Sequence, residues 1–462
     1  MFNWCSSLPS LLVATATEAE KPTLVLTAVL LTLAIIYFTS KVGAELSRMA
    51  NFPPVLGELV GGVIIGVSAL SLVVFPESVT ADKSLVMNVL NFLNPMSEEL
   101  FTKVFESESE VISVLAELGV VVLLFEIGLE SDIRELKKVG IKATIVAVAG
   151  VTAPFAMGTA GLIYFFHFPA VPAIFAGAAL TATSIGITSK VLSELGWLKS
   201  KEGQIIIGAA VIDDILGIII LAVVASLAKT GEVNLVQVLL LIVSAVAFLI
   251  GSILLGSIFN KTFEAIVENL KTRGSIIIPA FIFALLMAFL ANAIHLEAIL
   301  GSFAAGLVLD ETDARNELDE QVKPIADVIV PLFFVTVGAR VDLGVLNPVV
   351  PENREGLYIA TFLITVAIIG KIVSGWSFLS GEKINRLGIG IGMIPRGEVG
   401  LVFAGIGASS GVLTKPLEAA IIIMVIITTF LAPPLLKLVL GEAEAETETQ
   451  VVAKGEEVKT PF

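Results

Sequence analysis

Ionisable side chains occur inside the long apolar stretches of this sequence, where they are costly. A charged residue at the centre of a bilayer costs about 2.5–3.5 kcal/mol on insertion scales. Glu58 and Glu126 lie toward the middle of two such stretches, and five more residues lie well inside others. Because packing gives no reason to keep these charges, we expect them to pair and to serve a function. The five are Asp213, Asp214, Lys371, Arg396 and Glu398.

Asp213 and Asp214 are neighbours in the apolar segment 208–217. Adjacent residues of an α-helix project about 100° apart. The two carboxylates should therefore face different neighbours and have different roles. One would face a water-filled cavity, and the other would pair with a cationic side chain. Lys371 is the natural cationic partner. A purely structural ion-pair cluster of the three side chains is the alternative.

Hydroxyl side chains are dense in the segment 181–189, which includes Thr183 and Ser184. Hydroxyl, carboxylate and carbonyl oxygens are the ligands that a hard cation such as Na⁺ prefers. These hydroxyls therefore indicate a cation site close to the paired aspartates. Hydrogen bonding between helices, which is common for serine and threonine in membranes, is the alternative.

The segment 395–400 reads Pro-Arg-Gly-Glu-Val-Gly. Proline and glycine interrupt helical hydrogen bonds and free backbone carbonyls and helix ends. Arg396 and Glu398 would project about 200° apart on a regular helix. We therefore expect them to neutralise the ends of interrupted helices, or to reach Glu126, rather than to pair with each other.

The composition places these residues in a membrane protein. The chain has 462 residues, of which 56% are hydrophobic and 15% charged, and its mean hydropathy is +0.96. Soluble domains contain about 25% charged residues, so an ordinary soluble enzyme is excluded. The net charge of −15 argues against a nucleic-acid partner. One cysteine, Cys5, allows no intrachain disulfide, and with two histidines proton handling falls mostly to carboxylates and lysine.

Apolar windows of about 20 residues, the length that a helix needs to cross a bilayer, predict thirteen spans in this sequence. Apolar and polar residues do not alternate in them, so we expect an all-α polytopic fold rather than a membrane β-barrel. An N-terminal arm is expected over 1–22, a transmembrane domain over 23–440 and an acidic, disordered cytoplasmic tail over 441–462. The spans are 23–40, 53–75, 111–129, 139–165, 170–192, 204–228, 234–258, 275–294, 296–309, 324–340, 357–380, 387–410 and 416–439.

Lysine and arginine are distributed unevenly between the loops. Sixteen of them follow odd-numbered spans and six follow even-numbered spans. Because cytoplasmic loops are enriched in these residues, the first set of loops should be cytoplasmic. The N-terminus is then expected outside and the C-terminus inside.

Three short patterns recur seven spans apart. Spans 2 and 9 share Leu-Gly-x-Leu/Phe-x-x-Gly, at 56–62 and 300–306. Spans 3 and 10 share Gly-x-x-x-Asp, at 128–132 and 338–342, and spans 5 and 12 share a glycine between aliphatic residues. Because seven is odd, equivalent helices cross the membrane in opposite directions. The order predicts two inverted five-helix repeats, typical of secondary transporters with crossed, broken helices at mid-membrane.

As a set, these segments resemble the cation/proton antiporter superfamily, in the branch that carries paired aspartates. The resemblance covers nearly the whole membrane part. It rests on the segment 181–188, the segment 210–217 with its aspartate pair, the pattern at 333–342, Lys371 and the segment 395–401.

The resemblance implies a homodimer in the lipid bilayer, in which a six-helix core domain moves against a dimerisation scaffold like an elevator. In that family the second aspartate of the pair binds the cation and the first pairs with the lysine. Asp214 would then be a transient sodium ligand, and Asp213 would pair with Lys371. The core would come from spans within 139–228 and 357–439, and the scaffold from spans within 23–129 and 275–340.

The expected function is secondary active exchange of sodium, or lithium, for protons, without a cofactor or catalytic residues. Cation and proton would compete for Asp214, with Thr183 and Ser184 as further ligands. Potassium/proton exchange on the same site is the alternative. A potassium-efflux branch of the superfamily has a neutral residue before the aspartate, and Asp213 departs from that pattern. The expected location is a bacterial-type inner membrane or a thylakoid membrane.

Two other classes of protein place carboxylates within membranes. Intramembrane aspartyl proteases carry their aspartates on two helices, with a Gly-x-Gly-Asp motif, whereas here the pair lies in one segment without that motif. A channel would need a continuous pore and usually lacks a buried Asp–Lys pair. Both are therefore remote alternatives to a transporter.

Overall fold

The computed structural model describes residues 18–77, 79–131, 133–230, 235–378 and 383–442. Within these ranges every regular element is a helix, as the pattern of apolar residues predicts. The greater part of the predicted N-terminal arm, and all but the first residues of the predicted tail, lie outside the described residues.

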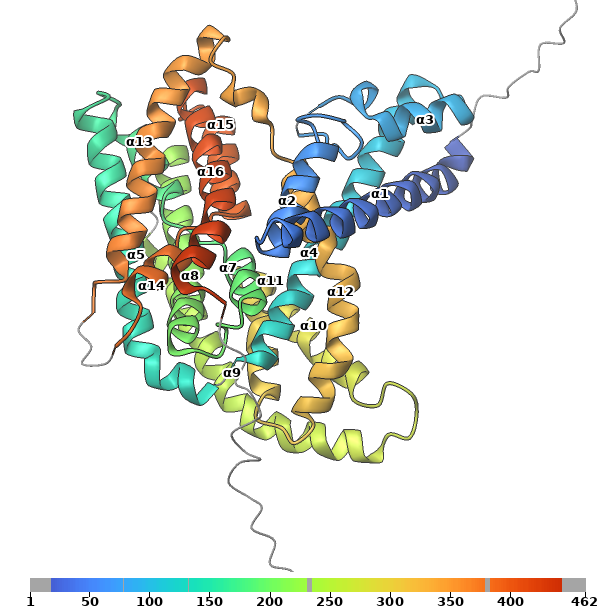
Figure 1. The fold of residues 1–462 in the computed structure, drawn as a ribbon, viewed down its shortest axis with the longest axis vertical. Helices are drawn as coiled ribbons and strands as arrows, with labels where there is room; N and C mark the ends of the chain where they lie inside the picture. Colours follow the sequence, from blue (N-terminus) through green and yellow to red (C-terminus); the bar gives the residue numbers. More distant parts are fainter. Residues whose placement is uncertain (1–17, 78, 132, 231–234, 379–382, 443–462) are drawn as a thin grey trace, which may run out of the picture.

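The helices gather in two groups that lie side by side (Figure 1). In the first group, α4 packs on α11 and α12, and α2 packs on α1 and α12. This group contains α1 (Lys21–Met49), α2 (Pro54–Ile65), α3 (Leu85–Leu93), α4 (Glu98–Glu130), α10 (Ile277–Ala293), α11 (Ala298–Leu309) and α12 (Arg315–Ala339).

In the second group, α5 packs on α8 and α13, and α13 packs on α16 (Figure 1). The helix α9 (Leu235–Asn269) follows α8 of this group and precedes α10 of the first group. The second group contains α5 (Ile133–Tyr164), α6 (Ala170–Ala179), α7 (Ile185–Glu194), α8 (Lys201–Thr230), α13 (Pro351–Ser374), α14 (Arg386–Gly392), α15 (Glu398–Ser409) and α16 (Lys415–Leu440).

Seven of the described helices are long and apolar enough to cross a membrane, namely α1, α4, α5, α8, α12, α13 and α16. Other predicted spans fall on shorter apolar helices, such as Pro54–Ile65, Ala170–Ala179, Ile277–Ala293 and Ala298–Leu309. The predicted span 53–75 shows the reason. Its helix, α2, ends at Ile65, and the apolar residues after it form a loop in which Ser71 and Leu72 donate backbone hydrogen bonds to Gly66 and Ile65.

Two helices are interrupted at the positions that the sequence predicts. The segment between α6 and α7, residues 180–184, and the segment between α14 and α15, residues 393–397, are not helical. Pro395 lacks an N–H to donate to a helix, and Gly397 has a high entropic cost in one. The hydroxyl-rich break at 180–184 has neither residue type, and its non-helical backbone is held by hydrogen bonds to the break at 393–397.

Glycines allow close crossings between helices of the first group. A Cβ atom on Gly62 of α2 would lie 2.9 Å from the Cα of Gly338 on α12. A Cβ atom on Gly128 of α4 would lie 3.0 Å from the Cα of Gly306 on α11. Both glycines of each pair belong to the recurring sequence patterns, so the two crossings have equivalent positions in the sequence repeat.

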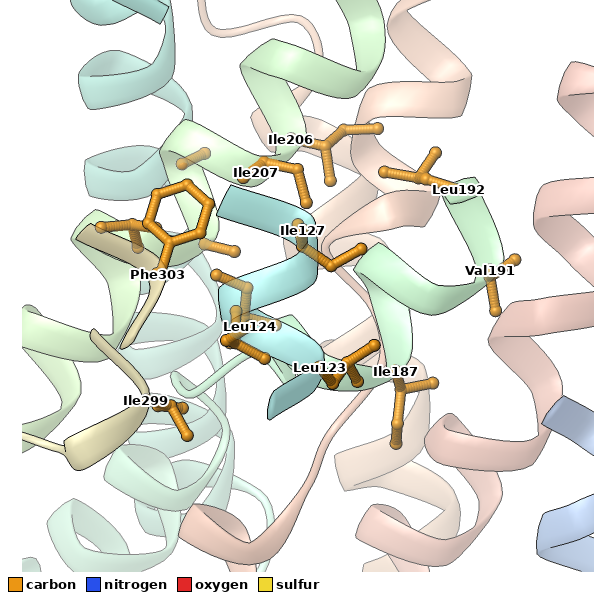
Figure 2. Packing of buried hydrophobic residues seen from close by; sticks show 14 of the residues in the cluster. Leu123, Leu124, Ile127, Ile187, Val191, Leu192, Ile206, Ile207, Ile299 and Phe303 are labelled. Atoms are coloured by element: carbon orange, nitrogen blue, oxygen red, sulfur yellow. The ribbon is translucent and has the colours of Figure 1, made fainter. Parts of the chain in front are cut away.

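Apolar side chains fill the region where α4, α7, α8 and α11 meet (Figure 2). Leu124 and Ile127 of α4 lie between Ile187 of α7 and Phe303 of α11, with Ile206 of α8 nearby (Figure 2). Because lipid tails are as apolar as these side chains, close packing rather than transfer from water holds such helices together. This packed region links the two groups and supports the interrupted helix from one side.

Candidate functional site

Lys371 and Asp213 meet in the middle of the second group. The Lys371 Nζ lies 3.3 Å and 3.4 Å from the two carboxylate oxygens of Asp213. It also donates a 2.6 Å hydrogen bond to the backbone carbonyl of Thr181. Both ionisable side chains are fully buried. The structure therefore brings together the pair that the sequence analysis expects, and the lysine also satisfies a carbonyl freed by the end of α6.

Asp214 faces a different environment from Asp213. Its side chain is 4% exposed and lines a small cavity with Thr183 and Ser184. The cavity measures about 10 Å³, which is close to the space that one water molecule needs. The adjacent aspartates thus point to separate neighbours, as the geometry of a helix requires. A cation in this cavity would have a carboxylate and hydroxyl oxygens around it, the donor set that suits Na⁺.

The two interrupted helices are joined at their breaks by hydrogen bonds. The backbone N–H of Ser184 donates to the carbonyl of Pro395 at 2.8 Å, and the hydroxyl of Thr183 donates to the carbonyl of Met393 at 3.1 Å. One turn further, the hydroxyl of Thr188 donates to the carbonyl of Gly392 at 2.9 Å. The hydroxyl-rich segment therefore fixes the second break while it lines the cavity.

Gly397 permits the closest approach of the two breaks. A Cβ atom at this position would lie 2.8 Å from the Oγ and 3.1 Å from the Cβ of Ser184. Those distances are shorter than side chains normally tolerate, so a glycine is required for Ser184 to keep its place. Gly397 also lines the cavity beside Asp214.

Arg396 is fully buried and reaches across to the other break. Its Nη1 donates to the carbonyl of Ala182, and its own carbonyl accepts a hydrogen bond from the hydroxyl of Thr429. Its Nε and Nη2 have no hydrogen-bond partner among the described residues. The guanidinium thus places a positive charge at the carbonyl end of α6, one of the two locations that the sequence analysis expects.

Glu126 lies away from this cluster. It is on α4, and the charges that act on it come from Lys190, Glu130, Asp327 and Asp319. The expectation that Arg396 reaches Glu126 therefore has no support in the structure. The side chain of Glu398 lies outside the described residues, although its backbone begins α15.

Two contributors to the site escaped the sequence analysis. Glu297, directly before α11, lines the same cavity as Asp214. Thr429 of α16 anchors the break through Arg396. A carboxylate at the edge of a short predicted span was the available signal for Glu297. Nothing in the sequence near Thr429 distinguishes it from other threonines of membrane helices.

Comparison with known proteins gives the family. Residues 28–441 match the family described as sodium/hydrogen exchanger, transmembrane. The chain belongs to the sodium/hydrogen exchanger family. Members of this family are transporters rather than enzymes. Both aspartates of this exchanger lie on one helix, α8, which agrees with a transport site and not with a protease dyad.

Relatives of this exchanger cover most of its length. It is 56% identical over 439 residues to the high-affinity Na⁺/H⁺ antiporter NhaS3 of Synechocystis, covering 95% of each chain. It is 31% identical to the Na⁺/H⁺-K⁺ antiporter GerN of Bacillus cereus, over 88% of this chain and 95% of GerN. The fold is similar to that of the sodium proton antiporter MjNhaP1 of Methanocaldococcus jannaschii, with a TM-score of 0.59, 17% identity and coverage of 92% and 100%.

Proposed function

We propose that this exchanger is a secondary active transporter that exchanges sodium, or lithium, for protons across a membrane. The observation that carries the proposal is the cavity at the two helix breaks, where Asp214, Thr183 and Ser184 come together. The strong similarity to a relative named as a Na⁺/H⁺ antiporter supports the same conclusion.

Competition for Asp214 would couple the two fluxes. Oxygen ligands bind a hard cation such as Na⁺, and Asp214 and the neighbouring hydroxyls supply them. A proton on the same carboxylate neutralises the charge that holds the cation. The site would therefore carry a cation or a proton, but not both.

Lys371 and Asp213 would supply the second titratable element. When a cation occupies Asp214, the neighbouring lysine would lose its proton or its ion pair with Asp213. If Lys371 or Asp213 gives up a proton in this step, two protons are exchanged for one Na⁺ and each cycle moves net charge. A membrane potential of 100 mV would contribute about 2.3 kcal/mol per charge to such a cycle.

Alternating access would come from movement of one helix group against the other. The core would consist of α5–α8 and α13–α16, and the scaffold of α1, α2, α4 and α10–α12. The equivalent glycine crossings Gly62–Gly338 and Gly128–Gly306 support two inverted repeats within thirteen spans. The family resemblance adds a homodimer that associates through the scaffold.

The charge distribution of the loops supports one orientation in the membrane. The excess of lysine and arginine after odd-numbered spans favours an external N-terminus and a cytoplasmic C-terminus. A bacterial-type inner membrane or a thylakoid membrane would house the exchanger.

Proton flux in proteoliposomes tests the function directly. Na⁺, Li⁺ and K⁺ chlorides are added in turn to vesicles that contain the purified exchanger and an internal pH dye. We expect Na⁺ and Li⁺ to drive proton movement and K⁺ to be much weaker. Equal responses to Na⁺ and K⁺ would favour the alternative of a broader cation/proton antiporter, because the relative GerN is named for both ions. A cation leak without proton movement would indicate a channel.

A further inference from the structure

The cavity beside Asp214 is lined by residues of both helix groups. Asp214, Ser184 and Gly397 belong to the group of α5–α8 and α13–α16, whereas Glu297 and Ile299 belong to the start of α11. A second acidic residue therefore lines the small cavity of Asp214, to which the proposed function assigns the cation, and it comes from the other helix group.

The backbone around Glu297 is held in place by several contacts. Before it, His295 adopts φ 66°, which turns the chain between α10 and α11. The carbonyl of Glu297 accepts a hydrogen bond from the N–H of Leu300 at 3.1 Å, in the first turn of α11. The hydroxyl of Ser302 donates to the carbonyl of Val121 on α4, and Gly306 crosses Gly128. These contacts tie α11 to the scaffold, so Glu297 has a fixed position relative to α4.

We propose that Glu297 is a second, scaffold-borne carboxylate of the cation site that sets its sodium affinity. The inference rests on the proposed function and concerns the same cavity. A cation in about 10 Å³ of space cannot keep its hydration shell and depends on the charges that line the walls. Charge–charge attraction is stronger in such an enclosed site than in water, so the negative charge of Glu297 adds to that of Asp214.

Because the two acidic residues lie on different helix groups, the sodium affinity of the site would differ between the two transport states. Asp214 lies on the proposed core and Glu297 on the proposed scaffold. Movement of the core would carry Asp214 away from Glu297, leaving a single carboxylate on the cation. The site would therefore bind sodium more tightly in the arrangement described here than in the other transport state, which favours release on the far side.

The charge-neutral variant Glu297→Gln tests the proposal. Sodium-dependent proton flux is measured in proteoliposomes over a range of Na⁺ concentrations at fixed pH. We expect the half-saturating Na⁺ concentration to rise about tenfold, the size of one lost charge-assisted interaction, while the maximal rate changes little. Glu355→Gln is the matched control, because Glu355 is an exposed acidic residue near the start of α13, outside the cavity. Equal half-saturation in the wild type and Glu297→Gln would overturn the proposal.

A cysteine variant separates charge from shape. In a Cys5→Ser background, which removes the natural cysteine of the chain, Glu297→Cys is treated with a negatively charged or a positively charged methanethiosulfonate. The negative reagent should restore the low half-saturating Na⁺ concentration, and the positive one should raise it further. The same effect from both reagents would show that volume, not charge, matters at this position and would refute the proposal.

Different results would exclude the proposed function and the role of Glu297. If the wild type moves no protons in response to Na⁺, the proposed function is wrong. If the wild type exchanges Na⁺ for protons but Glu297→Gln and both modified cysteine variants match it in half-saturation, only the assignment of Glu297 is wrong. Should Glu297→Gln fail to assemble, as judged by size-exclusion chromatography, the two modified forms of Glu297→Cys decide the question.

Discussion

Ser184 and Pro395 are joined by a 2.8 Å backbone hydrogen bond across the breaks of two helices that are far apart in the sequence. Proline has no N–H, but its carbonyl is free because α14 has already ended. Ser184 in turn is the residue before α7 and its N–H has no helical partner. Each break thus satisfies a group that the other leaves open, and the cavity beside Asp214 depends on this mutual arrangement.

Gly397→Ala should disturb the cavity through Ser184. The added methyl group would lie 3.1 Å from the Cβ and 2.8 Å from the Oγ of Ser184, so the serine must move. We expect at least an approximately tenfold loss of Na⁺-driven proton flux, because small displacements in a preorganised site have effects of that size. Gly405→Ala, on α15 with open space around it, is the control and should retain activity. Full activity in both variants would show that Ser184 is not needed at its present position.

Gly338→Ala should destabilise the fold of the first helix group. Its Cβ would lie 3.0 Å from the Cα of Gly62, so α2 and α12 would have to separate. Overpacking of this kind typically costs about 1–3 kcal/mol, visible as a lower melting temperature in detergent. Gly140→Ala on α5 has no atom within 4 Å of the new Cβ and serves as the control. An unchanged melting temperature for Gly338→Ala would mean that this crossing does not limit stability.

Asp213 and Lys371 should show strong coupling in a double-mutant cycle. Removal of one member of a buried ion pair leaves an uncompensated charge and costs about 3–5 kcal/mol. Asp213→Asn and Lys371→Gln should each lower the melting temperature, and the double variant should recover much of the loss because both charges leave together. Strictly additive losses would indicate that the two residues are independent, despite their separation of 3.3 Å.

Sodium affinity should depend on pH in a defined direction. Protons compete with sodium for a carboxylate, because a ligand must lose its proton before it binds a metal ion. Where the site is mostly protonated, the half-saturating Na⁺ concentration should rise about tenfold for each unit of decrease in pH, with one competing proton. If the maximal rate decreased as the pH was lowered while the half-saturating Na⁺ concentration stayed constant, protonation would be acting outside the proposed cation site.

Local chemistry explains which parts of the site were predictable. The pairing of Lys371 with Asp213 follows from the cost of an isolated buried charge. The break at 393–397 follows from its proline and glycine, and the break at 180–184 follows from the inverted repeat. These arguments need only the types of the residues and the order of the segments along the chain. The contact of Arg396 with Ala182 was predicted only as one of two alternatives, because the spacing of residues does not say which neighbouring helix a long side chain will reach.

The ends of the helices within the apolar stretches were much harder to predict. Hydropathy windows treat apolar loops and helices alike, which is why the predicted span 53–75 runs past the end of α2 at Ile65. The same limitation concealed Glu297, which stands at the start of the short helix α11 and yet lines the cavity beside Asp214. A carboxylate at a helix end is usually solvated, so only the tertiary arrangement identifies it as part of the site.

Cation and proton are proposed to share Asp214, and the Asp214→Asn variant tests this sharing in a single exchange measurement. Asparagine preserves the size of the side chain but can neither carry the negative charge nor bind a proton at neutral pH. The variant is purified, shown by size-exclusion chromatography and melting to be folded, and reconstituted beside the wild type. We predict that an imposed Na⁺ gradient moves protons in wild-type vesicles and moves none above background with Asp214→Asn. Wild-type rates of Na⁺-driven proton movement by the folded variant would contradict the account.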